Sequence, residues 1–217
     1  VFDDTPGESR IELGTTQYQS HLQLGHLKQQ TDNARQANRG HGAEIKTQAS
    51  LALRAGNGLY LSTDARPHAS GAHLDSREAI AQTEDAQRLS HSLAAVAAQQ
   101  NAALKGDPAA DQLPAIDSLQ HATTVLKATA SQNAGQGSQG TIKTTLGGTG
   151  SIPAWSEPRL QLNAPAGIAQ LTPKNHILVA GKHLAIATGQ DTNLIAQGNH
   201  SLAVKNGLAL YTVESPR

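Results

Sequence analysis

The sequence predicts a mainly β protein in which an elongated stem is interrupted by an α-helical insertion. Three observations support this fold class. Large aliphatic residues recur every eight residues in the last third of the chain, and turn-forming residues fall between them. Aromatic residues make up only 2% of the 217 residues, and Cys and Met are absent. A chain so poor in large side chains has little from which to build a conventional single-chain core.

The eight-residue repeat is regular from residue 160 to residue 212. Six of seven successive rows carry a large aliphatic residue in the same column, and each row reads large, x, large, x, small. That alternation is the period of a β-strand. The remaining positions hold residues that favour bends, such as Gly181, Gly189 and Pro173. A short strand and a short bend, repeated without insertion, indicate the stacked rungs of a β-solenoid or β-prism.

One column of this repeat is the candidate core, and it also occurs earlier in the chain. Its members are Leu53, Leu61, Leu162, Leu178, Ile186, Leu194, Leu202 and Leu210. Burying one Leu or Ile stabilises a fold by about 1.5–3 kcal/mol, but a single rung offers nothing of its own to cover two of them. The sequence therefore predicts an octad-repeat triple-stranded β-helix, or β-prism, in which three chains each turn one apolar face to a common axis. The alternative is a one-chain coil, for which eight residues per rung is short.

Between the two octad blocks, the pattern changes to that of helices. Asp75 and Glu78 have capping-box spacing, apolar residues from Ile80 to Leu104 recur mostly three and four apart, and Gly106 follows. A second helix could begin with Asp111 as its cap and Pro114 in its first turn. These two stripes predict an antiparallel helical hairpin inserted into the stem.

The chain therefore divides into four expected segments. They are a first β-stem segment (1–74), the inserted helical hairpin (75–131), a flexible linker rich in Gly, Ser, Gln and Thr (132–152), and a second β-stem segment with the eight-residue repeats (153–217). Trp155, the only tryptophan, lies where the chain returns to the stem. We expect it to plug the join between hairpin and stem rather than to stack on a ligand.

Composition argues against several classes of function. The formal net charge is +0, so there is no electrostatic footprint for nucleic acid. No apolar run approaches the roughly 20 residues that cross a bilayer, so we expect no stable membrane insertion. The absence of Cys removes thiol nucleophiles and Cys-based zinc sites. Nothing assembles a nucleophile, a base and an orienting group, so we expect no enzyme and assign no catalytic, cofactor-binding or metal-binding residue.

Two histidines interrupt an apolar column of the repeat. His176 and His200 stand where other rows carry Leu or Ile, so by phase they point inward. In a three-fold assembly, each would place three imidazoles near one axis, where they could bind water, an anion or a metal. The simpler interpretation is that they hydrogen-bond across chains or that the prism is wider at these rows.

Three long stretches resemble a known family. They are "VFDDTPGESRIEL" (Val1 to Leu13), "RGHGAEIKTQASLALRAGNGLYLSTDARPHASGAHLDSREAI" (Arg39 to Ile80) and "PAWSEPRLQLNAPAGIAQLTP" (Pro153 to Pro173). The chain resembles the C-terminal β-stem region, a domain of unknown function, of VgrG. These proteins are the trimeric spike-tip proteins of bacterial type VI secretion systems and are related to phage cell-puncturing needles.

The resemblance implies a structural needle or shaft module. Such a module extends the puncturing tip and presents a secreted effector, or its adaptor, as cargo. The implied partners are two further copies of the chain, the effector or adaptor, and a PAAR-type tip protein. The implied location is the bacterial cytoplasm before firing and then the medium or a target cell. The resemblance carries over no catalytic residue.

Two other functions remain open at this point. The domain could be an effector with hydrolytic, toxic activity that uses His and Asp residues near the hairpin. It could also be an adhesin-like trimeric binding module, with Trp155, Tyr60 or Tyr211 as stacking platforms for sugars.

Overall fold

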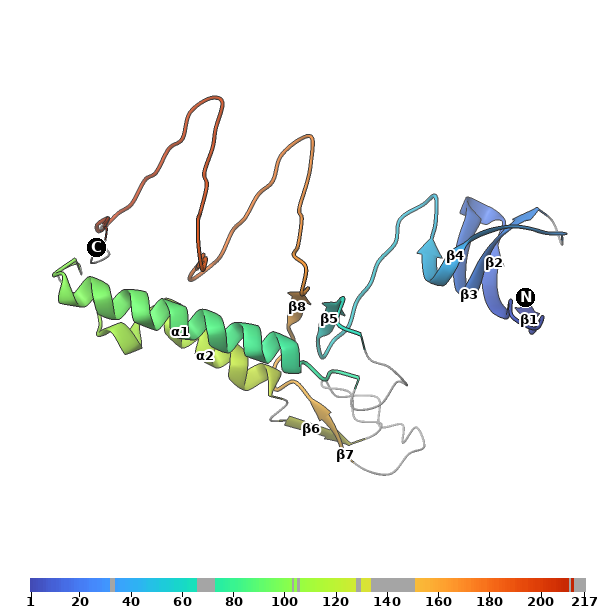
Figure 1. Cartoon of the computed structure of the whole chain (residues 1–217), viewed down its shortest axis with the longest axis horizontal. Helices are drawn as coiled ribbons and strands as arrows, with labels where there is room; N and C mark the ends of the chain where they lie inside the picture. Colours follow the sequence, from blue (N-terminus) through green and yellow to red (C-terminus); the bar gives the residue numbers. More distant parts are fainter. Residues whose placement is uncertain are drawn as a thin grey trace. The chain divides into compact units, whose positions relative to one another are not determined.

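The computed structural model describes residues 1–31, 34–65, 73–102, 104, 106–127, 130–133, 151–210 and 212. It is mainly β, with two α-helices, and Figure 1 shows its elements along the chain. The chain divides into two compact units, Val1–Arg54 and Ala55–Arg217. Each unit is described by itself.

The first unit is an antiparallel sheet with the strand order β1-β2-β3-β4. Its strands are β1 (Phe2–Asp3), β2 (Arg10–Thr15), β3 (Ser20–Thr31) and β4 (Ala34–Lys46), and a 3₁₀ turn, η1 (Gln17–Gln19), joins β2 to β3. Ile11 faces Leu24 and Leu13 faces Leu22 across β2 and β3. Alternation in the sequence indicates a strand but not the direction of its neighbour, and here successive strands form hairpins.

The second unit begins with a parallel strand pair that brackets the insertion. β5 (Leu59–Ser62) pairs with β8 (Leu160–Asn163), and Leu61 lies opposite Leu162. Both leucines belong to the predicted core column. The chain thus leaves one strand and returns on its parallel neighbour with the predicted column in register, so the insertion does not shift the phase of that column.

The inserted hairpin consists of α1 (Arg77–Gln99) and α2 (Pro114–Leu126), with a 3₁₀ turn, η3 (Ala110–Gln112), before α2. Pro114 occupies the first turn of α2, as its sequence position predicts. The two predicted caps are wrong. The residue before α2 is Leu113, and Asp111 lies in η3.

At the start of α1, the cap position belongs to Ser76 rather than Asp75. The Ser76 hydroxyl donates a hydrogen bond of 2.9 Å to the carbonyl of Leu126 and so ties the start of α1 to the end of α2. The Asp75 carboxylate accepts from the backbone N–H of Arg77 at 3.3 Å. The Ser76 hydroxyl thus bonds to a residue 50 positions away in the sequence. A local capping pattern does not predict such a long-range contact.

The ends of the predicted linker are ordered as a strand pair. β6 (Ala130–Asn133) runs antiparallel to β7 (Ser151–Ala154). The rest of the predicted linker lies outside the described residues.

Residues 164–210 form an open zigzag of extended segments and bends (Figure 1). Turns or bends fall at residues 165–166, 173–174, 181–182, 189–190, 197–198 and 205–206. Each follows the previous one by eight residues, which is the period that the sequence predicts.

Candidate functional site: an unpaired stem and its join to the hairpin

The predicted core column is exposed in the single chain. The exposed fraction is 63% for Leu178, 75% for Leu194 and 86% for Leu210. The remaining members, Leu53, Leu61, Leu162, Ile186 and Leu202, are also exposed. Soluble proteins rarely leave so long an apolar row open to water unless it marks an interaction surface.

The backbone of the same run is also unpaired within the chain. Among the described residues 164–210, no backbone N–H is bonded to a backbone carbonyl. The run has local side-chain bonds, from the Lys174 N–H to the Thr172 hydroxyl at 3.1 Å and between the Thr188 and Thr192 hydroxyls at 2.9 Å. Extended backbone with unpaired donors and acceptors is a template for pairing with another strand.

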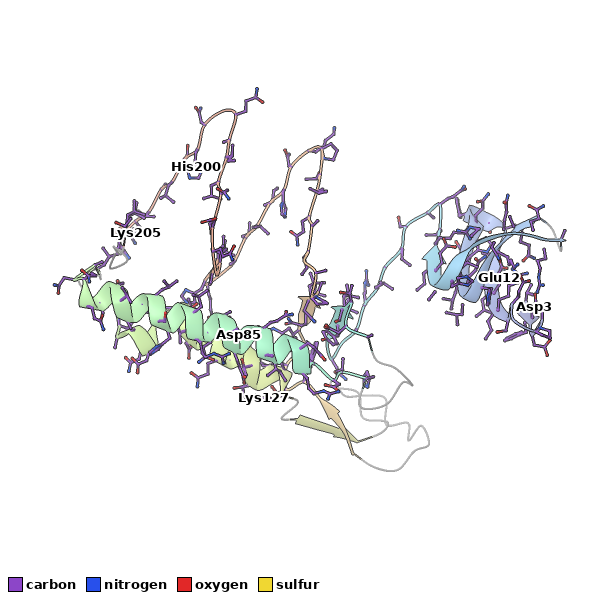
Figure 2. The ribbon with its side chains drawn as sticks, viewed as in Figure 1. Asp3, Glu12, Asp85, Lys127, His200 and Lys205 are labelled. Carbon is purple, nitrogen blue, oxygen red and sulfur yellow. The ribbon has the colours of Figure 1, made fainter. Side chains whose placement is uncertain are left out.

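The two histidines of interest lie on this open run. His176 and His200 are exposed, and Figure 2 shows His200 on the zigzag. Within the described part of one chain, no group of three His, Cys, Asp or Glu side chains could hold a metal ion. The inward orientation of both imidazoles stays a prediction.

Trp155 packs at the join between the hairpin and the stem. It is 3% exposed and forms a buried cluster with Ala79 of α1 and with Val125 and Leu126 of α2. Its ring meets that of Tyr60 on β5 edge to face, with centroids 5.8 Å apart. Trp155 therefore plugs the join, as expected, and its proposed role as a sugar platform is wrong because the ring is covered. Tyr211 lies outside the described residues.

Gly58 makes this packing possible. A Cβ atom added there would lie 2.6 Å from Cε3 of Trp155, and the φ of +131° is one that side chains with a Cβ rarely adopt. Only glycine allows the backbone before β5 to pass so close to the indole ring.

Buried polar atoms without a partner gather around the same strands. They include the Tyr60 hydroxyl, Trp155 Nε1, Arg159 Nη1 and Asn163 Oδ1. Leaving such an atom unpaired costs about 1–3 kcal/mol. The join therefore has hydrogen-bonding capacity that the described part of a single chain does not use.

The first unit has one apolar and one polar face. Phe2, Ile11, Leu13, Leu24 and Ile45 share a face by register, and all five are exposed. The alternate residues of β2, Arg10 and Glu12, are buried. In the single chain, the apolar face is thus the open one.

The polar face is held by a network centred on Glu12, which Figure 2 labels within the sheet. The Glu12 carboxylate accepts from Gln23 Nε2 at 3.1 Å and contacts His21 Nδ1 at 2.9 Å and Arg10 Nη1 at 3.4 Å. Arg39 of β4 donates to Gln23 Oε1 at 3.2 Å. The long β3–β4 hairpin supplies part of this network, which explains how charged residues are buried without being left unpaired.

Ion pairs shift the pKa values of the carboxylates on this face. Hydrogen bonds from Thr5 and Arg35 hold the pKa of Asp3 well below its ordinary value. The hydrogen bond from Lys28 lowers the pKa of Glu8. The paired guanidinium of Arg39, with contacts of 2.8 and 2.5 Å, lowers the pKa of Glu44.

The described helices include none that combines the length and apolar character needed to cross a membrane.

Two family models match separate parts of the chain. Residues 1–97 match the putative type VI secretion system Rhs element Vgr, and residues 147–216 match an uncharacterized protein conserved in bacteria (DUF2345). The second match spans the described zigzag.

Two curated spike proteins of Pseudomonas aeruginosa are similar over most of the chain. They are the type VI secretion system spike proteins VgrG2a and VgrG2b, each 30% identical over 197 residues, or 91% of this chain. The match covers 23% of VgrG2a and 19% of VgrG2b, so the chain spans about a fifth to a quarter of these relatives.

Two solved structures share the fold. One is the VgrG spike from the type VI secretion system, at 28% identity with a TM-score of 0.72, covering 100% of this chain and 68% of that one. The other is a VgrG spike with the Tle1 effector bound to it, at 27% identity and the same TM-score of 0.72, covering 100% and 55%. Together with the family matches, these similarities show that the chain belongs to the VgrG family of type VI secretion spike proteins.

Proposed function

We propose that this chain is a shaft module of the type VI secretion spike, built as a stem of three identical chains. The observation that carries the proposal is the run 164–210. Its extended segments have neither a backbone partner nor cover for their apolar column within the described chain, yet they keep a strict eight-residue period. Two further copies would supply both the missing hydrogen bonds and the missing apolar walls.

The proposed assembly agrees with the rest of the described chain. The exposed apolar face of the first unit also needs cover, and a face of this kind buries well against copies of itself. The unpartnered polar atoms at Trp155 and Asn163 could bond to a neighbouring chain. In such a stem, the core would be the column from Leu162 to Leu210, together with Leu53 and Leu61, with His176 and His200 towards the axis.

A stem of this kind suits mechanical work. When each strand bonds to strands of other chains above and below it, the shaft has no free lateral edge along its length. Bending it would break hydrogen bonds in all three chains. A shaft that is pushed through a membrane needs this stiffness.

We further propose that the module presents cargo and leaves the cell with it. A spike relative is known with the Tle1 effector bound, which supports an effector or its adaptor as a partner of this chain. A PAAR-type tip protein is a further proposed partner. The proposed location is the bacterial cytoplasm before firing and the medium or a target cell afterwards.

Row deletions in the full spike protein test the shaft. Removing residues 185–192 deletes one whole row and keeps the phase of the rows that follow, whereas removing residues 185–188 puts those rows out of phase. We expect the first deletion to preserve trimers and release of the spike into the medium, and the second to abolish both. Equal behaviour of the two deletions would contradict the rung interpretation.

We propose a structural rather than an enzymatic role, because the relatives are spike proteins. Hydrolytic toxicity is the competing function. Expression of the chain in a bacterial periplasm tests it, since growth inhibition there would contradict the structural role.

A further inference from the structure

The C-terminal half of α1 carries a second apolar stripe that leaves room for a partner. The stripe consists of Leu89, Leu93 and Val96. At 100° per residue, the middle of the stripe lies about 75° around the helix axis from Ala79, which is the buried residue of α1. Leu93 is 46% exposed, and Leu104, which follows the end of α1, is 37% exposed. α1 therefore has an apolar side that the described chain covers only in part.

The outer side of the proposed stem carries no charged residue and is largely apolar. The residues that alternate with the core column form it. Its large members are Leu171, Ile177, Val179 and Ile195, and its other members are small or polar residues without charge. A solvent-facing strand surface usually carries charged or polar residues on this side. Ile195 and Val179 are 93% and 88% exposed in the single chain. We therefore expect another part of the assembly to pack against these side chains.

Two contacts place α1 along the stem. Near its start, Ala79 packs with Trp155, and α1 also contacts β8. Beyond its end, the Leu104 side chain lies against Gly207, where an added Cβ would be 3.1 Å from Leu104 Cδ1. The row that begins at residue 160 and the row that begins at residue 208 are six rows apart.

The lengths agree with a stem in which three rows make one turn. Six strand spacings amount to about 29 Å, and a helix of 23 residues is about 35 Å long, so α1 can span them at a modest tilt. With three rows per turn, the rows that begin at 160, 184 and 208 lie on the same side of the stem. The intervening rungs on that side must then come from the other two chains.

Resting on the trimeric stem proposed above, we propose that α1 is a strap that packs its stripe against the outer side of rungs contributed by partner copies of this chain. The side chains fit this arrangement. The chain's own row beneath α1 offers only the small residues Ala185 and Ala187, whereas the flanking rows, which partners would supply, offer Ile177, Val179 and Ile195. Val96 lies about two thirds of the way from Ala79 to Leu104 along the chain. The row of Ile195 lies at the same fraction of the distance from the row at 160 to the row at 208, so the two residues are at about the same level of the stem. In this arrangement, α1 of each chain contacts the outer surface of strands from the other two chains and stabilises the trimer.

Thiol cross-linking tests this proposal, because the chain contains no Cys. Val96→Cys with Ile195→Cys, treated with a short bifunctional thiol reagent, should link chains into species of two and three times the 22.6 kDa chain mass on a denaturing gel. Ala95→Cys with Ile195→Cys is the matched control, since residue 95 points about 100° away from residue 96 on the helix. Leu104→Cys with Gly207→Cys should link within one chain.

The outcomes separate this inference from the proposed stem. A trimer in solution with no link between chains at residues 96 and 195, or with equal linking in the Ala95 control, overturns the strap and leaves the stem intact. A monomer in solution overturns the stem on which the strap rests.

A second measurement uses single substitutions. Leu93→Lys should raise amide hydrogen exchange across residues 86–102 at least tenfold while the trimer persists, because it removes the stripe from the stem. His91→Lys, at an exposed position on the side of α1 opposite the stripe, should leave that exchange unchanged. Unchanged exchange in Leu93→Lys would contradict the strap.

Discussion

Leu194→Asp is the substitution that most directly challenges the proposed core. Leu194 lies in the middle of the repeat, two rows after Leu178 and two rows before Leu210, and is 75% exposed in the single chain. In a three-chain stem, the substitution would remove three leucines from one layer of the axis and replace them with three carboxylates.

The expected cost follows from burial. Covering one leucine is worth about 1.5–3 kcal/mol, so the three lost leucines cost about 5–9 kcal/mol per trimer. Three carboxylates of like charge in an apolar layer add a further penalty, because buried charges need partners. Since about 1.4 kcal/mol is a factor of ten, the association constant should fall at least about a thousandfold.

Light scattering coupled to size exclusion, over a range of protein concentrations, measures this loss. Gln190→Glu is the matched control, since it adds the same charge in the exposed bend at residues 189–190 and should leave the mass unchanged. A Leu194→Asp chain that still forms trimers as stable as those of the control would refute the reasoning.

Three further predictions concern the join and the polar face. Gly58→Ala should lower the melting temperature of the second unit, because the new Cβ would meet Trp155 and the backbone there has a positive φ, whereas Gly56→Ala, which meets nothing within 4 Å, should not. Trp155→Ala should cost about 3–5 kcal/mol of unfolding free energy, measured by denaturant unfolding followed by circular dichroism, and a loss below 1 kcal/mol would argue against the join. The third prediction concerns pH. The pKa of Glu44 is lowered in the folded chain, so the unfolded chain takes up its proton first as pH falls, and stability should be level above about pH 5 and decline below about pH 4. Arg39→Gln should make that acid decline shallower, and an unchanged pH profile would count against the ion pair.

The parts of the fold that the sequence predicts are those set by local periodicity. The eight-residue spacing of large residues predicts bends that the chain places eight apart from residue 165 to residue 206. Helical spacing predicts the two helices, and Pro114 lies in the first turn of the second. Trp155 is the single tryptophan and lies where the chain leaves the insertion. Its position predicts a buried contact between the hairpin and the following strand, because so large an apolar side chain needs cover.

The parts that the sequence does not predict depend on long-range contacts. Alternation in β2 separates Arg10 and Glu12 from Ile11 and Leu13, but it does not say that the single chain buries the charged pair. That burial requires Arg39 and Gln23, which other strands bring to the same face. The octad column is open in the single chain, and the cover proposed for it comes from other chains, which local patterns in one sequence do not describe.

Absolute mass in solution is the measurement that tests the trimeric stem most directly. Light scattering on the unmodified chain should give a mass near three times 22.6 kDa. A mass near 22.6 kDa at all concentrations would contradict the account, and the apolar column from Leu162 to Leu210 would then need a different cover.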